Sequence, residues 1–317
     1  MRRCLTAVAV VVLGVTAASA SEEDGAGAAF VTSQLADTLS IVDLATMQVA
    51  AQIRIGGKPA GVAIAPGGAR AYVTSPDSHE LTIVDAAARK VVATVKVGQG
   101  PLGVAFDAKR NRALVADWYE HKIFAVDGET GAIVGEAQTG LSPSGVAVTP
   151  DGERIVTADR DSDQISILNA DTLKAIATVG VGKRPFGVTI SADGARAYTA
   201  NVQSDDVTII DLGAKKAVAT VKVGARPYAV ALAGGKAFVT NQHGESVSVI
   251  DLASQQTIKT IDVGAYPEGA ATSADGRFVY VACWDANTLE RIDVQTLTVT
   301  AKATVANGPR AFGAFLR

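Results

Sequence analysis

The sequence predicts an all-β fold, a seven-bladed β-propeller of four-stranded blades, because two short markers recur at one spacing along most of its 317 residues. The first marker is a proline ahead of an apolar run, found at Pro59, Pro101, Pro143, Pro185, Pro227, Pro267 and Pro309, at intervals of 42 residues with a single interval of 40. The second is a short polar residue that closes an apolar run, found at Asp43, Asp85, Asp127, Asn169, Asp211, Asp251 and Asp293 with the same intervals. A period of about 40 residues that two independent markers keep is typical of propeller blades.

Residues 59–98 show the elements of one unit in order. Short runs at 61–65, 71–74, 81–84 and 91–97 are rich in Val, Ile and Thr, which favour strands. Gly, Pro and Asp separate these runs, as expected for the turns between strands. No unit shows an apolar period long enough for a competing helix. Each unit is therefore predicted to be a sheet of four strands, A to D in chain order, with strand A nearest the axis.

The two ends of the repeat predict how the ring closes. The first unit begins at a strand B, residues 30–32, and has no strand A before it. The chain ends after Pro309 with a lone strand A at residues 312–315. We expect this C-terminal strand to complete the first blade, so that six whole blades and one shared blade leave no long unpaired edge.

The first twenty residues have the three-part anatomy of a secretory signal peptide. Two arginines precede an apolar run at residues 5–15, and residues 18–20 read Ala-Ser-Ala, an A-x-A cleavage signal. The run is shorter than the roughly 20 apolar residues that a membrane-spanning helix needs. We therefore expect cleavage after Ala20, a short flexible segment at 21–27, a single propeller domain at 28–317, no transmembrane segment, and a periplasmic or secreted location.

Composition excludes several classes of function. Removal of residues 1–20 leaves 27 basic and 32 acidic residues, a net charge of −5, so we expect no nucleic-acid partner. Cys283 is the one cysteine beyond the leader, which excludes an intrachain disulfide in the mature chain. The sequence holds no C-x-x-C-H haem motif and no close set of zinc ligands, and we expect neither a cofactor nor a metal. Asp159, Asp161 and Asp163 alternate as in a calcium loop, but the segment lacks the glycine and the distal glutamate of such a loop. A solvated loop is therefore favoured, with calcium binding by these aspartates as the alternative.

Several strand-B runs resemble the YVTN repeat. They are Tyr72-Val73-Thr74-Ser75, Tyr198-Thr199-Ala200-Asn201 and Phe238-Val239-Thr240-Asn241. Flanking runs such as 219–224 and 247–251 fit the same repeat, and the resemblance extends over residues 28–317. It implies an exported or cell-surface seven-bladed propeller, and it implies no shared chemistry.

Positions that differ between blades are the candidates for a site, since positions that recur hold each blade together. Strand alternation places the D–A and B–C connections on one face, here called the top face, and the A–B and C–D turns on the other, the bottom face. The residues beside the prolines and in the B–C loops vary most, and they include both tryptophans and two of the three histidines. The candidate ligand- or partner-binding residues are Lys58, Trp118, His121, Arg184, Phe186, Arg226, Tyr228, His243, Glu268, Trp284 and Arg310.

This pattern favours a monomeric binding or scaffold protein over an enzyme. The basic residues of the set would attract a protein, a peptide or a small anionic ligand, and the aromatic residues would add apolar contact. We assign no catalytic residue. One alternative is a periplasmic enzyme of lactonase or lyase type, which needs His243, Glu268 and Arg310 to converge on a pocket at the channel mouth. Another is an accessory protein to an exported quinoprotein or cytochrome redox system.

Overall fold

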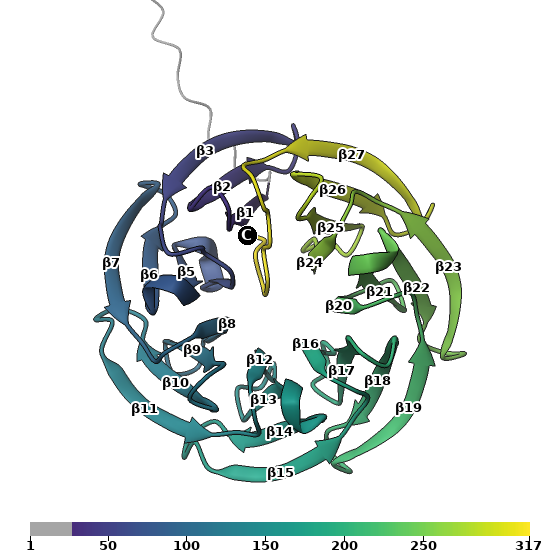
Figure 1. The fold of residues 1–317 in the computed structure, drawn as a ribbon, viewed down its shortest axis with the longest axis horizontal. Coiled ribbons are helices and arrows are strands. Elements are labelled where there is room, and N and C mark those ends of the chain that lie inside the picture. The colour runs from purple at the N-terminus through teal and green to yellow at the C-terminus, as the bar shows by residue number, and fades with distance from the viewer. Residues whose placement is uncertain (1–26) are drawn as a thin grey trace, which may run out of the picture.

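The computed structural model describes residues 27–317. The predicted leader at 1–20, and all but the last residue of the predicted segment at 21–27, lie outside the described residues. Seven antiparallel sheets stand around a central axis (Figure 1), one for each predicted blade. The predicted all-β, seven-bladed propeller is therefore confirmed.

The strands follow one another from the axis outward in every blade. The first blade holds β1 (Ala28–Ser33), β2 (Thr38–Asp43) and β3 (Gln48–Arg54). The next three blades hold β4 (Val62–Ile64), β5 (Arg70–Ser75), β6 (Glu80–Asp85) and β7 (Lys90–Lys96); β8 (Pro101–Asp107), β9 (Arg112–Asp117), β10 (Lys122–Asp127) and β11 (Ile133–Gln138); and β12 (Pro143–Val148), β13 (Arg154–Asp159), β14 (Gln164–Asn169) and β15 (Ala175–Gly180). The last three hold β16 (Pro185–Ile190), β17 (Arg196–Asn201), β18 (Asp206–Asp211) and β19 (Lys216–Lys222); β20 (Pro227–Ala233), β21 (Lys236–Asn241), β22 (Ser246–Asp251) and β23 (Gln256–Asp262); and β24 (Pro267–Thr272), β25 (Phe278–Cys283), β26 (Thr288–Asp293) and β27 (Thr298–Thr304).

Helix is confined to single turns in the described part of the chain. These are the 3₁₀ turns η1 (Pro66–Gly68), η2 (Pro76–Ser78), η3 (Arg160–Ser162) and η4 (Gln242–Gly244). Within residues 27–317, no helix has the length and apolar character needed to cross a membrane.

Burial differs between the strands of a blade. The second strand of each blade is buried almost throughout, as in β9, because neighbouring blades cover both of its faces. The outermost strand is mostly exposed, with part-buried or buried residues between the exposed ones, as in β3, because only one of its faces meets a neighbour. The core is therefore a ring of inter-blade layers around the axis.

The recurring aspartates hold the C–D turns. Asp43 Oδ1 accepts hydrogen bonds from Thr46 N at 2.7 Å and Thr46 Oγ1 at 2.8 Å. The equivalent Asp or Asn of each of the other six blades accepts the backbone N–H three residues on. The structural role that their recurrence indicates is confirmed, and it closes the same turn seven times on the bottom face.

Backbone hydrogen bonds show which loops share a face. The B–C loop of the second blade bonds the preceding D–A loop through Asp77 N and Gly57 O at 3.2 Å. The C–D turn bonds the A–B turn through Ala86 N and Ala69 O at 3.0 Å. The two loop pairs therefore lie on opposite faces, as strand alternation predicts.

The C-terminal residues lie against β1, near the centre of Figure 1. Arg310 N donates to Thr32 O at 2.7 Å and Phe30 N donates to Phe315 O at 2.8 Å. This arrangement is consistent with the predicted closure, but residues 309–317 form isolated bridges rather than a regular fourth strand. Two positive φ angles, 45° at Ala311 and 121° at Gly313, interrupt the extended backbone there.

Candidate functional site

At the top end of the central channel, four of the residues that follow the repeat prolines pack into one buried apolar group. It comprises Ala60, Leu102, Phe186 and Tyr228 together with Val202 and Phe312, and Trp118 packs against it. We call Phe186, Tyr228 and Phe312 the aromatic plug. Ring centroids lie 4.0 Å apart for Phe186 and Tyr228. Those of Phe186 and Phe312 lie 4.9 Å apart, within the range of about 4.5–7 Å typical of favourable aromatic pairs.

The plug corrects one expectation. Phe186 and Tyr228 are expected from the sequence to be contact residues on the surface, but they are 5% and 6% exposed. The reason is geometric, since the inner segments of the blades converge on one axis and large side chains there meet each other.

A buried polar cluster adjoins the plug. Arg310 Nε lies 2.8 Å from Glu268 Oε2, and Arg310 also donates through Nη2 to the Tyr228 hydroxyl. Gln242 Nε2 donates to Glu268 Oε1 at 2.8 Å. Although close, Arg310 Nε and Glu268 Oε2 lack a well-directed hydrogen bond. The channel mouth therefore holds an ion pair in which Arg310 Nε and Glu268 Oε2 have no hydrogen-bond partner.

Burial controls the acid–base behaviour of this cluster. It raises the pKa of the Glu268 carboxyl, although Arg310 and Gln242 act in the opposite direction. Burial also raises the pKa of Tyr228. Burial acts to lower the pKa of Arg310, but the charge of Glu268 and the contact with Tyr228 outweigh it, so the pKa is raised and Arg310 stays a cation.

Trp118 forms the edge of the mouth. Its ring centroid lies 6.3 Å from that of Phe186, and the guanidinium of Arg160 lies 5.0 Å from the ring centroid. Such a cation–aromatic contact adds about 0.5–1 kcal/mol at an exposed site. Trp118 is part-buried, so it both packs against the plug and offers an edge to solvent.

Three basic candidates stand further out on the D–A loops. Lys58, Arg184 and Arg226 are exposed and adopt positive φ angles of 55°, 54° and 53°. Their backbone N–H groups donate to Asp37, Asp163 and Asp205 at 2.9, 2.8 and 2.8 Å. The loops are thus held rigidly while the side chains extend outward; Lys58 also pairs with Asp77 at 2.9 Å.

The remaining candidate residues, His121, His243 and Trp284, contact residues outside the polar cluster. His121 Nδ1 accepts Ser142 N at 3.0 Å, which ties two loops together. His243 packs on Tyr266 with ring centroids 5.3 Å apart, and Tyr266 lies 6.3 Å from Trp284. Glu268 and Arg310 therefore meet as the enzyme alternative requires, whereas the loop residue that contacts Glu268 is Gln242 rather than His243.

The aspartates of the possible calcium loop have separate partners. Asp159 is buried and accepts Ser166 Oγ at 2.6 Å and Gly140 N at 3.0 Å. Asp161 pairs with Arg160, and Asp163 pairs with Lys183. Among residues 27–317, no group of three or more His, Cys, Asp or Glu side chains lies close enough to hold a metal ion.

Cys283 interrupts a hydrogen-bond pattern, and a neighbouring strand compensates. In the sixth blade, Ser248 Oγ accepts Gly224 N at 3.1 Å and bonds Asn241 at 2.9 Å. The seventh blade has Cys283 in place of that asparagine, and Glu290 Oε1 accepts Gly264 N at 3.1 Å. Burial raises the pKa of the Cys283 thiol to about 12, so the thiol is neutral and belongs to the core.

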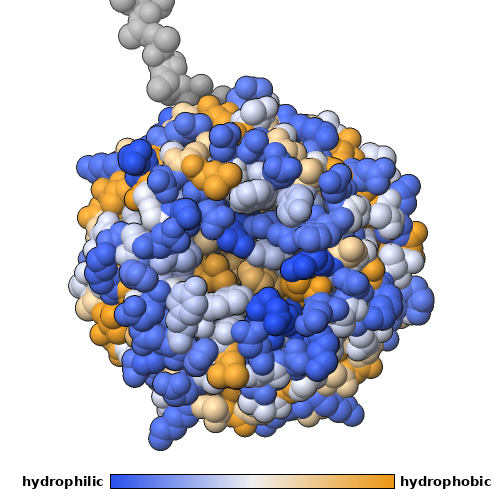
Figure 2. All heavy atoms as spheres, viewed as in Figure 1, coloured by the Kyte–Doolittle hydropathy of each residue, from blue (hydrophilic) through white to orange (hydrophobic). Residues whose placement is uncertain are grey.

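Sequence reasoning missed three residues of the mouth. Phe312 stands where the other inner strands have Val or Ala, three positions after the proline, and that contrast could have revealed it. Gln242 and Arg160 each follow the last residue of a second strand, where no repeated residue marks them. Figure 2 shows the result on one face of the ring, with hydrophilic residues around a central hollow in which hydrophobic residues are visible.

Comparisons with known proteins agree with this fold. The family model described as YNCE-like β-propeller matches residues 8–111 and 113–314. No curated protein matches the chain significantly. Among solved structures, hydrazine synthase of Kuenenia stuttgartiensis is similar at 18% identity, with a TM-score of 0.76 over 82% of this chain and 90% of that one.

Two further structures are similar in the same way. Dihydro-heme d1 dehydrogenase NirN has 15% identity and a TM-score of 0.67, over 89% of this chain and 74% of that one. A protein of unknown function from Desulfotomaculum acetoxidans has 15% identity and a TM-score of 0.77, over 90% of this chain and 98% of that one. At such identities the likeness is one of fold.

Proposed function

Because this chain belongs to the YNCE-like β-propeller family, whose fold fixes no single chemistry, we propose that it is an exported binding or scaffold protein that engages a partner on its top face. The partner presents carboxylates or other anionic groups. It is a protein or a peptide rather than a small ligand, because the aromatic plug fills the channel mouth and leaves a broad surface there.

One observation carries the proposal. Arg184 and Arg226 extend from D–A loops whose backbone is fixed by Asp163 and Asp205. A surface that is rigid before binding loses little conformational entropy when a partner arrives. Exposed guanidinium groups bind carboxylates with paired hydrogen bonds. Trp118, which packs near Phe186 and Arg160 on the same face, supplies the kind of aromatic anchor that dominates many interfaces.

Charge reversal tests this proposal. The double variant Arg184→Glu, Arg226→Glu should weaken partner capture from an extract of exported proteins by about tenfold or more, equivalent to ~1.4 kcal/mol. Arg310 is left intact because it pairs with buried Glu268. Higher salt should weaken capture by the unaltered protein, since exposed charges are screened.

The bottom face offers a matched control. Arg89 and Lys215 are also exposed and basic, with φ of 53° and 54°. Their reversal to Glu should leave capture unchanged. Equal capture by the Arg184→Glu, Arg226→Glu protein, or equal loss in the two double variants, would contradict a top-face site.

An enzyme of lactonase or lyase type is the second candidate, because Glu268 and Arg310 meet at the mouth. A panel of γ- and δ-lactones tests it. Turnover by the unaltered protein that Glu268→Gln abolishes, with cooperative melting retained, would support it; no turnover by the unaltered protein would dismiss it. The expected redox accessory role stays a prediction, because the similar redox proteins share only the fold.

A further inference from the structure

A cavity of about 560 Å³ lies in the central channel on the other side of the aromatic plug. Phe312 belongs to both the plug and the cavity wall, so the plug forms one end of the cavity. From there the cavity extends along the inner strands to the A–B turns, where Pro66, Pro150 and Ala192 line it. The channel is thus a pocket that is closed toward the top face.

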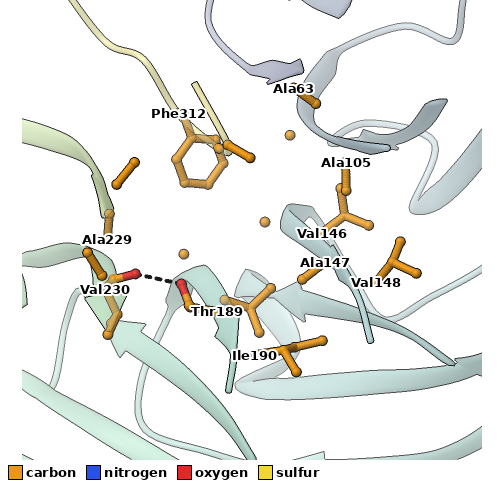
Figure 3. A pocket seen from close by; sticks show the side chains of 18 of the residues that line it. Ala63, Ala105, Val146, Ala147, Val148, Thr189, Ile190, Ala229, Val230 and Phe312 are labelled. Atoms are coloured by element: carbon orange, nitrogen blue, oxygen red, sulfur yellow. Dashed lines mark hydrogen bonds between the residues drawn. The ribbon is translucent and has the colours of Figure 1, made fainter. Parts of the chain in front are cut away.

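Small side chains create this space. Ala63, Ala105 and Ala147 occupy the same position on three successive inner strands, and Figure 3 shows them around the open centre with Phe312. These short side chains leave the axis hollow.

The lining is apolar in its side chains. Apart from Thr189 and Thr272, every lining residue is Gly, Ala, Val, Leu, Ile, Pro or Phe. Thr189 donates its hydroxyl hydrogen to Val230 O at 2.6 Å, and Thr272 donates to Leu232 O at 3.0 Å. No charged side chain is available in this lining to replace the hydration that an ion would lose on entry.

We infer that this channel is a binding pocket for a neutral, apolar small molecule that enters from the bottom face. Its volume falls within the range of about 300–1,000 Å³ found for pockets that bury small ligands. Apolar cavities of fixed shape bind apolar molecules readily because water gains little by filling them. The charged groups of Glu268 and Arg310 lie beside the plug, and neither lines this cavity.

Two fluorescent probes with the same aromatic framework test the inference. N-phenyl-1-naphthylamine is neutral, whereas 8-anilino-1-naphthalenesulfonate carries a sulfonate. We expect saturable binding of the neutral probe at one site per chain, and binding of the sulfonate about tenfold weaker or less. Absence of saturable binding by the neutral probe, or equal or tighter binding of the sulfonate, would overturn the inference.

Filling the cavity locates the site. The double variant Ala105→Phe, Ala147→Phe should weaken binding of the neutral probe about tenfold or more, because the added rings occupy the pocket. Ala175→Phe, on an exposed outer strand, is the matched control and should bind normally. Unchanged binding in a filled variant that still melts cooperatively would place the probe elsewhere and overturn the inference.

The comparison of the two probes needs no variant, so the test stands even if the filled protein fails to fold. Arg184→Glu, Arg226→Glu should bind the neutral probe normally, because both residues are on the top face. Loss of partner capture and loss of probe binding are therefore separate outcomes, and either proposal can fail without the other.

Discussion

The C–D turns on the bottom face and the channel mouth on the top face use the same repeat differently: the turns keep one residue type, whereas the mouth varies it. At the turns, seven equivalent Asp or Asn residues make the same backbone bond. At the mouth, seven equivalent residues include a Phe, a Tyr, a Glu and an Arg that contact one another across blades. Local repetition builds the scaffold, and variation at the axis builds the site. Substitutions should therefore have large, coupled effects at the mouth and small, uniform effects at the turns.

The largest effect is expected for Arg310→Ala. It leaves Glu268 buried without its cation, and loss of one partner of a buried pair costs about 3–5 kcal/mol of unfolding free energy. Urea unfolding at pH 7 measures this loss. The cost should shrink as pH falls through the raised pKa of Glu268, because a neutral Glu268 needs no counter-charge.

The double variant Glu268→Met, Arg310→Met is the control for that prediction. It removes both charges, so it should be far less destabilising than Arg310→Ala. If the single and double variants lose the same stability, the ion pair is not coupled as the geometry indicates.

Phe186→Ala should come next. The side chain is buried at the centre of the plug, and Phe→Ala changes in cores cost about 3–5 kcal/mol. We expect about 3 kcal/mol, since the exposed edge of Trp118 can move inward. Thermal or urea unfolding measures it, with Tyr119→Ala, a largely exposed aromatic, as the control. A loss below about 1 kcal/mol would show that the plug is loosely packed.

The variant Glu290→Ala tests whether Glu290 of the seventh blade replaces the hydrogen bond that Ser248 makes in the sixth. It removes the acceptor of Gly264 N and the partner of Lys302, 2.8 Å away. An unsatisfied N–H costs about 1–3 kcal/mol when fully buried, and Gly264 N is part-buried, so we expect a loss at the lower end of that range. The variant Cys283→Asn, Glu290→Ser copies the arrangement of Asn241 and Ser248 and should recover most of that stability. No recovery would mean that the two blades differ in more than these residues.

The smallest effect belongs to the turns. Backbone hydrogen bonds from Thr130 and Glu129 and the Thr130 hydroxyl lower the pKa of Asp127 from 3.8. A carboxyl with a lowered pKa stabilises the fold above its unfolded pKa, and this contribution is lost as pH falls through the folded pKa. Asp127→Asn copies natural Asn169, so it should leave stability at pH 7 nearly unchanged and make the decline below about pH 4 shallower. An unchanged acid profile would refute this assignment.

The sequence predicts the scaffold closely because each blade is specified locally. The runs at 61–65, 71–74, 81–84 and 91–97 match β4 to β7 within a residue or two. The regular strand expected at 312–315 fails because Ala311 and Gly313 adopt positive φ, which the repeat does not encode.

The site is only partly predictable, for a different reason. Comparison of blades identifies Glu268, Arg310 and Tyr228 as unusual, and the structure brings them together. It cannot tell whether the axis is plugged or hollow, because that depends on the summed volumes of side chains from seven strands. The plug at Phe186 and the cavity at Ala105 arise from residues three positions apart in their respective repeats.

Hydrogen exchange on the bound and free protein tests the central claim most directly, namely that the varied top face is the working face. With the captured partner bound, the account predicts slower amide exchange in the D–A and B–C loops, including residues 183–184 and 225–226, with unchanged exchange in the C–D turns. Slower exchange confined to the C–D or A–B turns would place the partner on the bottom face and contradict the account.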